Sequence, residues 1–445
     1  MYKTFESEES TILTSHLHLP SDMAICQADY PLDFYQEDLK PYAEEYMALP
    51  DRKLATIIPW MEKYIKPAVD HFGDSLLLLA HYYMGGEIVK LVEHFGGEVG
   101  DSYQLALKAA HNPEKKIIIE SAVHFMAESI SVLSNPDQRV YITNPKSGCT
   151  MEMHAKDYMV EPALEQMNAR YGSENVIPIC YMNTSARIKA LAGAQGGAVC
   201  TSSNVKKIFE WALAKGKRIL FIPDRHMGEN VASWVGIPKE RIAYWPGGIA
   251  GSQFNLESSE PTHFDQSQLV LFCSECSVHS HYSDKMIEYW KREGYHAVVH
   301  PECRYDTVRA ADSCGSTAFI FDQVVNDRAG TGKYAVGTEN HMVQNVKALC
   351  ASKGIHVVNL AEAIIDNVSS PGCGCATMSR NDPPHLVGLL DLLRQGKMMG
   401  ENLVKAGDVV DEFSGVRSRL SDKGQDWTIR NARAALEKMI EITES

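Results

Sequence analysis

Continuous apolar runs that end in polar residues recur along the chain and predict buried strands. Three such runs end in His81-Tyr82-Tyr83, in Tyr181-Met182-Asn183 and in His300-Pro301-Glu302. Short apolar runs bounded by turn residues are typical of strands that are covered on both faces. A helix-like stretch follows each polar end, so each unit predicts a strand, a polar tip and a helix.

A turn with small hydroxyl residues follows each unit and opens another predicted helix. The distance along the chain is 19 residues from Tyr83 to Ser102, 19 from Asn183 to Ser202 and 14 from Glu302 to Ser316. A strand-helix-strand-helix order at a repeated spacing predicts parallel strands with helices on both faces. We therefore predict an α/β fold of three pseudo-symmetric, three-layer αβα domains with parallel sheets, whose strand tips converge on one central site.

The repeat also predicts the domain boundaries. We expect an N-terminal extension with helices at residues 1–70, a first αβα domain at 71–148 and a second at 149–268. Residues 216–268 look like an insertion into the second domain. The third domain is expected at 269–382, and C-terminal helices at 383–445.

Composition narrows the class of protein. A formal net charge of -14 over 445 residues argues against a nucleic-acid-binding face. No run approaches the ~18 apolar residues of a membrane span, and the first residues do not resemble a secretory signal. The 11 cysteines then suggest a reducing compartment, and we expect a cytoplasmic protein.

Three loops that follow predicted strands or helices contain cysteine, at residues 144–149, 273–276 and 369–375. A single loop cysteine is most often a small buried hydrophobic residue. Three such loops in register with a threefold repeat instead predict thiolates at a shared centre, and thiolates select iron–sulfur, zinc or copper(I). A [4Fe–4S] cluster normally takes four thiolates, so three would leave one iron open as a Lewis acid.

Polar residues at the predicted tips and helix starts supply further chemistry. Candidates for proton transfer are Tyr83, His300 and Glu302. Residues placed to hydrogen-bond an anion near helix starts are Ser102, Asn183, Ser202, Ser316 and Thr317. Each hydroxyl taken alone is equally well explained as an ordinary helix cap.

Several short motifs match a known family in its order between residues 76 and 393. They are His81-Tyr82-Tyr83, Gly100-Asp101-Ser102, Phe125-Met126-Ala127-Glu128, Gly148-Cys149, Tyr181-Met182-Asn183-Thr184, Thr201-Ser202-Ser203-Asn204, Cys276-Ser277-Val278-His279, His300-Pro301-Glu302-Cys303, Gly315-Ser316-Thr317, Gly337-Thr338-Glu339 and Cys375-Ala376-Thr377-Met378. Each motif is short, but together they are specific. In these residues the chain resembles the quinolinate synthase family.

The resemblance implies three αβα domains around a [4Fe–4S] cluster with Cys149, Cys276 and Cys375 as ligands. It implies condensation of iminoaspartate with dihydroxyacetone phosphate to quinolinate, with loss of phosphate and water. L-aspartate oxidase could then supply the iminoaspartate. By the same resemblance, proton transfer falls to Tyr83, Tyr181 and Glu302, and substrate binding to His81, Ser102, Asn183, Ser202, His300, Ser316 and Thr317.

The chain departs from the family pattern at Ser277, where histidine is usual, and at Tyr82 and Met84. Two other functions stay open. One is a related iron–sulfur dehydratase that acts on another small anionic substrate. The other is a non-catalytic iron–sulfur sensor, which gives no account of Tyr83, Glu302 and the hydroxyl turns.

Overall fold

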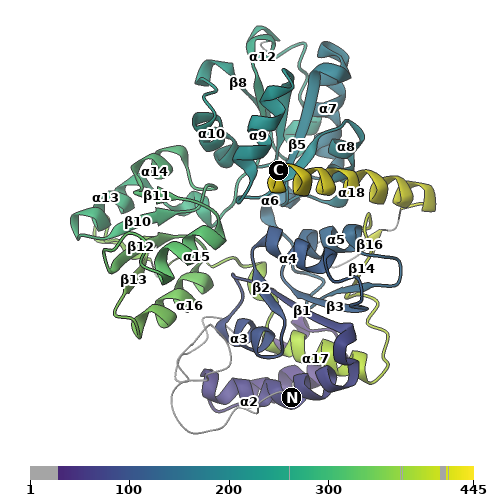
Figure 1. The fold of residues 1–445 in the computed structure, drawn as a ribbon, viewed down its shortest axis with the longest axis vertical. Coiled ribbons are helices and arrows are strands. Elements are labelled where there is room, and N and C mark those ends of the chain that lie inside the picture. Colours follow the sequence, from purple (N-terminus) through teal and green to yellow (C-terminus); the bar gives the residue numbers. More distant parts are fainter. Residues whose placement is uncertain (1–28, 260, 371, 373, 411–416, 419) are drawn as a thin grey trace.

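The computed structural model describes residues 29–259, 261–370, 372, 374–410, 417–418 and 420–445. Figure 1 shows three αβα lobes arranged around a common centre. The chain forms the three lobes one after another along the sequence. Helices cover both faces of each sheet, as the predicted α/β architecture requires. The outer elements that precede the first lobe are α1 (Lys40–Met47) and α2 (Leu54–Phe72).

The first sheet has the strand order β14-β4-β3-β1-β2. Its strands are β1 (Leu76–His81), β2 (Glu98–Gly100), β3 (Ile117–Ser121), β4 (Arg139–Ile142) and β14 (Leu403–Val404). Strands β1 to β4 are parallel, and β14 pairs antiparallel with β4. Its helices are α3 (Gly86–His94), α4 (Ser102–Ala110) and α5 (His124–Leu133), with α17 (Pro383–Arg394) packed on α2.

The second sheet is fully parallel, with the order β6-β5-β7-β9-β8. Its strands are β5 (Val176–Tyr181), β6 (Ala198–Cys200), β7 (Arg218–Ile222), β8 (Ile242–Pro246) and β9 (Leu269–Cys273). Its helices are α6 (Thr150–Met153), α7 (Asp157–Tyr171), α8 (Ala186–Ala194), α9 (Val205–Ala214), α10 (Arg225–Trp234), α11 (Ile249–Gln253) and α12 (Pro261–Gln266).

This sheet corrects the expected boundary at residue 269 and the expected insertion at 216–268. Strand β9 pairs with β7 and β8, so it belongs to the second sheet and not to the third domain. Strand β7 lies inside the sheet between β5 and β9, so it is part of the repeat. The edge strand β8 lies beyond the four core strands, at the edge that the antiparallel strand β14 occupies in the first sheet. An apolar run predicts a strand but does not reveal which strands it pairs with.

The third sheet is also parallel, with the order β11-β10-β12-β13. Its strands are β10 (His296–Val299), β11 (Ser313–Cys314), β12 (Lys333–Gly337) and β13 (His356–Asn359). Its helices are α13 (Asp284–Arg292), α14 (Tyr305–Ala310), α15 (Thr317–Val325) and α16 (Asn340–Ala351). The core orders β2-β1-β3-β4, β6-β5-β7-β9 and β11-β10-β12-β13 follow one pattern, which confirms the predicted repeat.

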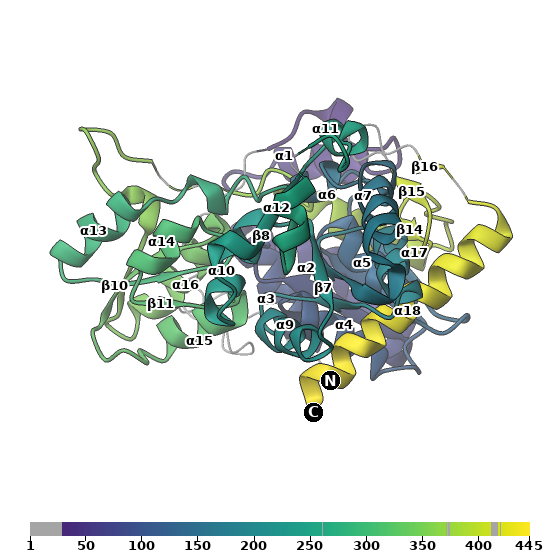
Figure 2. The same ribbon diagram turned by 90° about the horizontal axis from the view of Figure 1, so that it is seen from above.

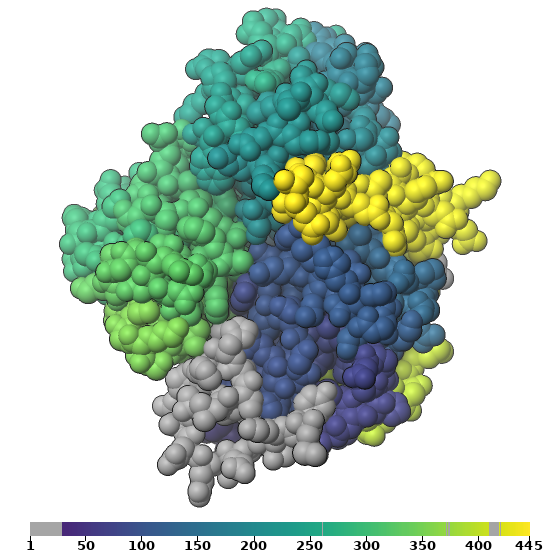
Figure 3. Space-filling model, viewed as in Figure 1, coloured from purple at the N-terminus to yellow at the C-terminus, as the bar shows by residue number. Residues whose placement is uncertain are grey.

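The long helix α18 (Asp422–Glu444) does not belong to any one of these sheets. It packs along α8 and also contacts β6, α9 and α5, so it touches both the first and the second domain. Figures 1 and 2 show α18 as a straight yellow helix, and Figure 3 shows it over the boundary between the first and second domains. A short antiparallel pair, β15 (Val409–Val410) and β16 (Arg417–Ser418), precedes it. Within the described residues, every helix is too short or too polar to cross a bilayer.

Candidate active site

The tips of the three sheets surround one cavity with a volume of about 70 Å³. Its wall combines residues from all three domains with the segment that follows β13. Twelve of the residues expected from the sequence line it: His81, Tyr83, Ser102, Cys149, Tyr181, Asn183, Ser202, Cys276, His300, Glu302, Thr317 and Cys375. Parallel sheets bind ligands at the carboxyl ends of their strands, and this cavity lies there in all three domains.

Ser316 is the expected site residue that does not line the cavity. Its hydroxyl accepts a hydrogen bond from the Phe319 N–H at 3.2 Å and so caps α15. Its neighbour Thr317 does face the cavity, and the Thr317 hydroxyl lies 3.2 Å from the Tyr83 hydroxyl. Ser316 therefore has the ordinary capping role that the sequence left open as an alternative.

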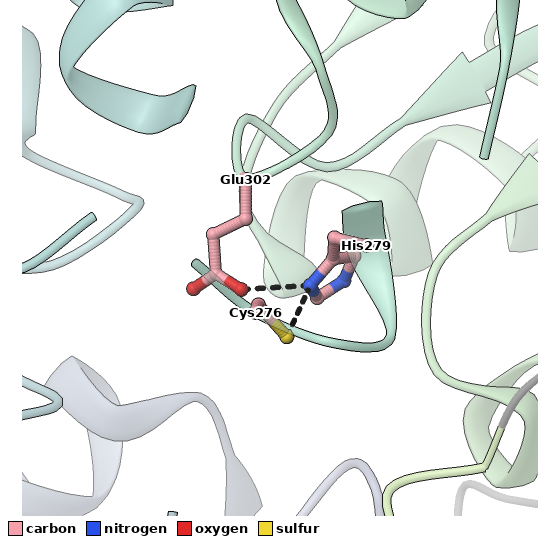
Figure 4. Close-up of side chains that lie close together, drawn as sticks. All are labelled: Cys276, His279 and Glu302. Carbon is pink, nitrogen blue, oxygen red and sulfur yellow. Dashed lines mark hydrogen bonds and ion pairs between the residues drawn. The ribbon is translucent and has the colours of Figure 1, made fainter. Parts of the chain in front are cut away.

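Glu302 is the centre of a buried hydrogen-bonded group at the tip of β10. The Tyr181 hydroxyl donates to Glu302 Oε1 at 2.7 Å, across the boundary between the second and third domains. The other carboxylate oxygen, Oε2, lies 2.7 Å from His279 Nδ1 (Figure 4). Only 3% of Glu302 is exposed, so these partners and not water satisfy the carboxylate.

His279 and Thr338 are site residues that we did not assign from the sequence. His279 Nδ1 lies 3.2 Å from Cys276 Sγ as well as close to Glu302, and its ring stacks on that of His300 at 4.4 Å. Thr338 follows β12 and places its hydroxyl 3.1 Å from His279 Nε2. The signals were present, since His279 follows Cys276 by three residues and Thr338 follows a strand. Strand β12 itself was not predicted, so its tip was not recognised as part of the site.

These contacts form one continuous hydrogen-bonded chain along the cavity, with Thr338 behind its lining residues. At one end, the Tyr83 hydroxyl lies 3.0 Å from the Thr338 hydroxyl, and the Thr338 hydroxyl contacts His279. At the other end, His279 contacts Glu302, and Glu302 accepts a hydrogen bond from Tyr181. The chain joins a tyrosine of the first domain to a tyrosine of the second through three groups of the segment 274–359. Groups connected in this way can pass protons between two ends of a substrate.

The surroundings set the charge of each group in this chain. Burial would raise the pKa of Glu302, but His279 and the hydrogen bond from Tyr181 hold it well below the ordinary value. Burial raises the pKa of Tyr181 and of Tyr83 well above the ordinary value, and the Glu302 carboxylate raises both further. Burial also lowers the pKa of His81 and of His300 to about 3. At neutral pH Glu302 is therefore a carboxylate anion among neutral tyrosines and neutral His81 and His300.

Three cysteine thiols reach the same cavity, each from the segment that follows the last core strand of a domain. Cys149 follows β4, Cys276 follows β9 and Cys375 follows β13. Burial raises the pKa of all three thiols, and Cys375 adds to the rise at Cys149 and Cys276, so the thiols lie close enough to interact. Partly buried soft donors that would otherwise stay protonated fit a thiophilic metal centre, which displaces the thiol protons. The neighbouring Cys373 lies outside the described residues.

Cys276, His279 and Glu302 also form a smaller group that could hold a single metal ion. Their ligand atoms all lie within 4.8 Å of one another (Figure 4). Sulfur, imidazole nitrogen and carboxylate oxygen in one triad are a donor set that zinc accepts. The cavity thus offers two geometries for a metal, one built on three thiols and one on this mixed triad.

Comparisons with known proteins agree with the motifs. A family model described as quinolinate synthetase A protein matches residues 65–410. The quinolinate synthase of Acidobacterium capsulatum is 34% identical over 403 residues, which cover 90% of this chain and 95% of that protein. The quinolinate synthases of Geobacillus kaustophilus and Corynebacterium glutamicum are 35% and 33% identical. Their alignments cover 76% and 91% of this chain, and 87% and 93% of the respective relatives.

Proposed function

The chain belongs to the quinolinate synthase family of enzymes, and on that premise we propose that it condenses iminoaspartate with dihydroxyacetone phosphate to form quinolinate for NAD biosynthesis. The reaction loses phosphate and water. The observation that carries the proposal is the convergence of three cysteine thiols, one after the last core strand of each domain, on the cavity that holds the Glu302 network.

Cys149, Cys276 and Cys375 would hold a [4Fe–4S] cluster. With three protein thiolates, such a cluster supplies an iron with an open position that acts as a Lewis acid on an oxygen-bearing substrate. Each thiol has a side-chain neighbour, and Asn183 Nδ2 donates to Cys149 Sγ at 3.9 Å. The Thr377 hydroxyl lies 3.3 Å from Cys375 Sγ, and His279 Nδ1 lies 3.2 Å from Cys276 Sγ. Contacts of this kind orient metal ligands and adjust their basicity.

The helix starts in the cavity wall suit the anionic groups of both substrates. Ser102 and Thr317 begin α4 and α15, and Ser202 lies in the turn before α9. Free N–H groups and the helix dipole favour phosphate or carboxylate at such positions. Neutral His81 and His300 and the Asn183 amide can then supply hydrogen bonds without adding charge.

Proton transfer is assigned to Glu302 and the two tyrosines. Because its pKa is lowered, Glu302 stays ionised at neutral pH and can accept a proton from a bound intermediate. Because their pKa values are raised, Tyr181 and Tyr83 stay protonated and can donate hydrogen bonds or protons. The hydrogen-bonded chain through Thr338 and His279 connects the two tyrosines, so a proton taken at one end can be returned at the other.

The substrates imply a supplier and a compartment. Iminoaspartate must come from an enzyme that oxidises aspartate, and L-aspartate oxidase fits this requirement. Free cysteines, such as Cys149 and Cys276, persist in a reducing compartment such as the cytoplasm.

A second candidate is a single metal ion at Cys276, His279 and Glu302, which the 4.8 Å grouping of their ligand atoms favours. A mononuclear site would use Glu302 as a ligand and leave Cys149 and Cys375 outside. Replacing Cys375 by alanine separates the two, because it removes a cluster ligand and spares the mixed triad. Iron, sulfide and zinc analysis of that variant gives the answer.

The experiment that tests the proposal is an anaerobic assay on reconstituted protein. With iminoaspartate and dihydroxyacetone phosphate, the wild-type protein is expected to form quinolinate and phosphate, and to contain iron and sulfide in equal amounts. Cys149→Ala, Cys276→Ala and Cys375→Ala should each lose the cluster and the product. Cys303→Ala is the control, because Cys303 is buried but its thiol contacts the Gly337 carbonyl outside the cavity. A normal cluster in Cys276→Ala would contradict the ligand assignment.

A further inference from the structure

Asn204 closes the turn that presents Ser202 to the cavity. Its side-chain oxygen accepts a hydrogen bond from the Thr201 N–H at 2.7 Å, which fixes the turn Thr201–Asn204 before α9. Asn204 is only 3% exposed, so its side-chain amide must find its remaining partner within the protein. A side chain that closes a turn in this way holds the backbone N–H groups of that turn in place.

The remaining partner of Asn204 comes from α18. Asn204 Nδ2 donates to the Thr443 hydroxyl oxygen at 3.0 Å, and the Thr443 hydroxyl donates to the Met439 carbonyl at 2.7 Å. The second bond orients the hydroxyl, so that its lone pair faces Asn204. Thr443 thus connects the last turn of α18 to the turn that carries Ser202, across 239 residues of sequence.

Thr443 also lies beside the equivalent turn of the first domain. Burial raises the pKa of Tyr103, and a side-chain hydrogen bond with Thr443 partly offsets the rise, so these two side chains are in contact. Tyr103 directly follows Ser102. Asp101, on the other side of Ser102, accepts a hydrogen bond from the Ser203 hydroxyl at 2.6 Å and caps α4. The turns that carry Ser102 and Ser202 are therefore joined to each other and to Thr443.

Close packing fixes α18 itself on both domains. A Cβ atom at Gly193 of α8 would lie 1.9 Å from the Asn431 carbonyl oxygen, so the two backbones touch at this glycine. On the first domain, Arg433 Nη2 donates to the Ser134 carbonyl at 2.7 Å, at the end of α5. Figure 3 shows α18 over the seam between the first and second domains. The family match ends at residue 410, so α18 lies outside it.

We propose that Thr443 is a positioning residue for substrate binding. Through Asn204 it holds the turn Thr201–Asn204, so that Ser202 and Ser102 face one anionic group of the substrate from two domains. This inference rests on the proposed function for the identity of that substrate, which carries a phosphate. Thr443 does not line the cavity itself, and it acts on the cavity through Asn204, with Tyr103 as its neighbour on the first domain.

The test compares three variants with the wild-type protein by hydrogen–deuterium exchange and by steady-state kinetics. Thr443→Val keeps the shape and removes the hydroxyl, whereas Thr443→Ser keeps the hydroxyl. Thr428→Val is the matched control, because Thr428 is fully buried on the same helix and its hydroxyl has no hydrogen-bond partner among the described residues. All three should unfold at a similar temperature.

Thr443→Val is expected to speed amide exchange in peptides that span residues 201–204 and to raise the KM for dihydroxyacetone phosphate by roughly 3- to 10-fold, with kcat nearly unchanged. Thr443→Ser should restore both values, and Thr428→Val should change neither. Unchanged exchange in Thr443→Val, or faster exchange with an unchanged KM, overturns the proposal. So does an equal effect in Thr428→Val. If the wild-type protein forms no quinolinate, the proposed function fails instead, and the exchange measurement alone decides whether Thr443 holds the turn.

Discussion

Two buried carboxylates in this protein, Glu302 and Glu120, differ in every respect except burial. Glu302 accepts from Tyr181 and contacts His279, and its pKa lies well below the ordinary value. Glu120, on β3, is fully buried, and neither carboxylate oxygen has a hydrogen-bond partner among the described residues. Burial accordingly raises the pKa of Glu120 to about 8. One group is an anion at neutral pH and the other is mostly a neutral acid.

The difference shows that partners, and not depth, decide which buried carboxylate is ionised at neutral pH. Desolvation disfavours the charged form at both positions. At Glu302, a donor from the second domain and an imidazole from the loop after β9 reverse that effect. The base therefore exists only when domains meet, which fits a site at a domain junction better than a structural ion pair.

The largest expected effect separates the two carboxylates by activity. Glu302→Gln keeps the size of the side chain and removes the base, so turnover should fall by roughly 10²- to 10⁴-fold while iron and sulfide content stays normal. Glu120→Gln should leave turnover close to the wild-type value. Anaerobic quinolinate formation measures both. Near-normal turnover in Glu302→Gln would reduce Glu302 to a structural acceptor.

The second effect concerns stability, and here Glu120 is the residue whose replacement matters. The folded-state pKa of Glu120 is about 8, above the 4.5 of a free carboxyl, so the folded protein binds more protons than the unfolded chain between these values. Stability from this group is therefore present below about pH 4.5 and is lost as the pH rises towards 8. Relative to the wild type, Glu120→Gln should gain about 3–4 kcal/mol between pH 5 and pH 8. Denaturant unfolding at the two pH values tests this, and a gain that is equal at both would be contradictory.

The sequence predicted those features of the fold and the site that depend on local pattern. The apolar runs before Tyr83, Asn183 and Glu302 formed strands whose tips meet, because parallel strands end at one edge. It did not predict the pairing of β9, because strand order depends on packing far along the chain. His279 and Thr338 were missed for the same reason. Their importance lies in contacts with Glu302 and Tyr83 that no local spacing contains.

A smaller effect is expected when one hydrogen-bond donor to Glu302 is removed. The Glu302 carboxylate then has fewer partners and resembles that of Glu120 more closely. Tyr181→Phe leaves Oε1 with one partner fewer, so the pKa of Glu302 should rise towards the ordinary value. The acid limb of the kcat/KM profile should then move to higher pH, and turnover at neutral pH should fall by roughly 10-fold. Tyr334→Phe is the control, because it removes a similar bond, to Asp327, away from the cavity. An unmoved acid limb would mean that Tyr181 does not set the ionisation of Glu302.

The smallest expected effect comes from the hydroxyl that supports His279. Thr338→Val keeps the side-chain shape but removes the oxygen that lies 3.1 Å from His279 Nε2 and 3.0 Å from the Tyr83 hydroxyl. His279 then loses one of its contacts, and the chain between Tyr83 and Glu302 is interrupted. Since one hydrogen bond contributes about 0.5–1.5 kcal/mol, kcat/KM should fall by roughly 2- to 10-fold with the cluster retained.

Thr307→Val is the matched control for this variant. Thr307 is equally buried in the third domain, but its hydroxyl donates to the carbonyl of Tyr282, which does not line the cavity. The Thr307→Val variant should be less stable than the wild type, but the protein that remains folded should keep the wild-type kcat/KM. If both variants lose activity to the same extent, Thr338 supports only the fold. If Thr338→Val alone is impaired, and its loss is not additive with that of Tyr83→Phe, the two hydroxyls act in one chain that ends at the ionised Glu302.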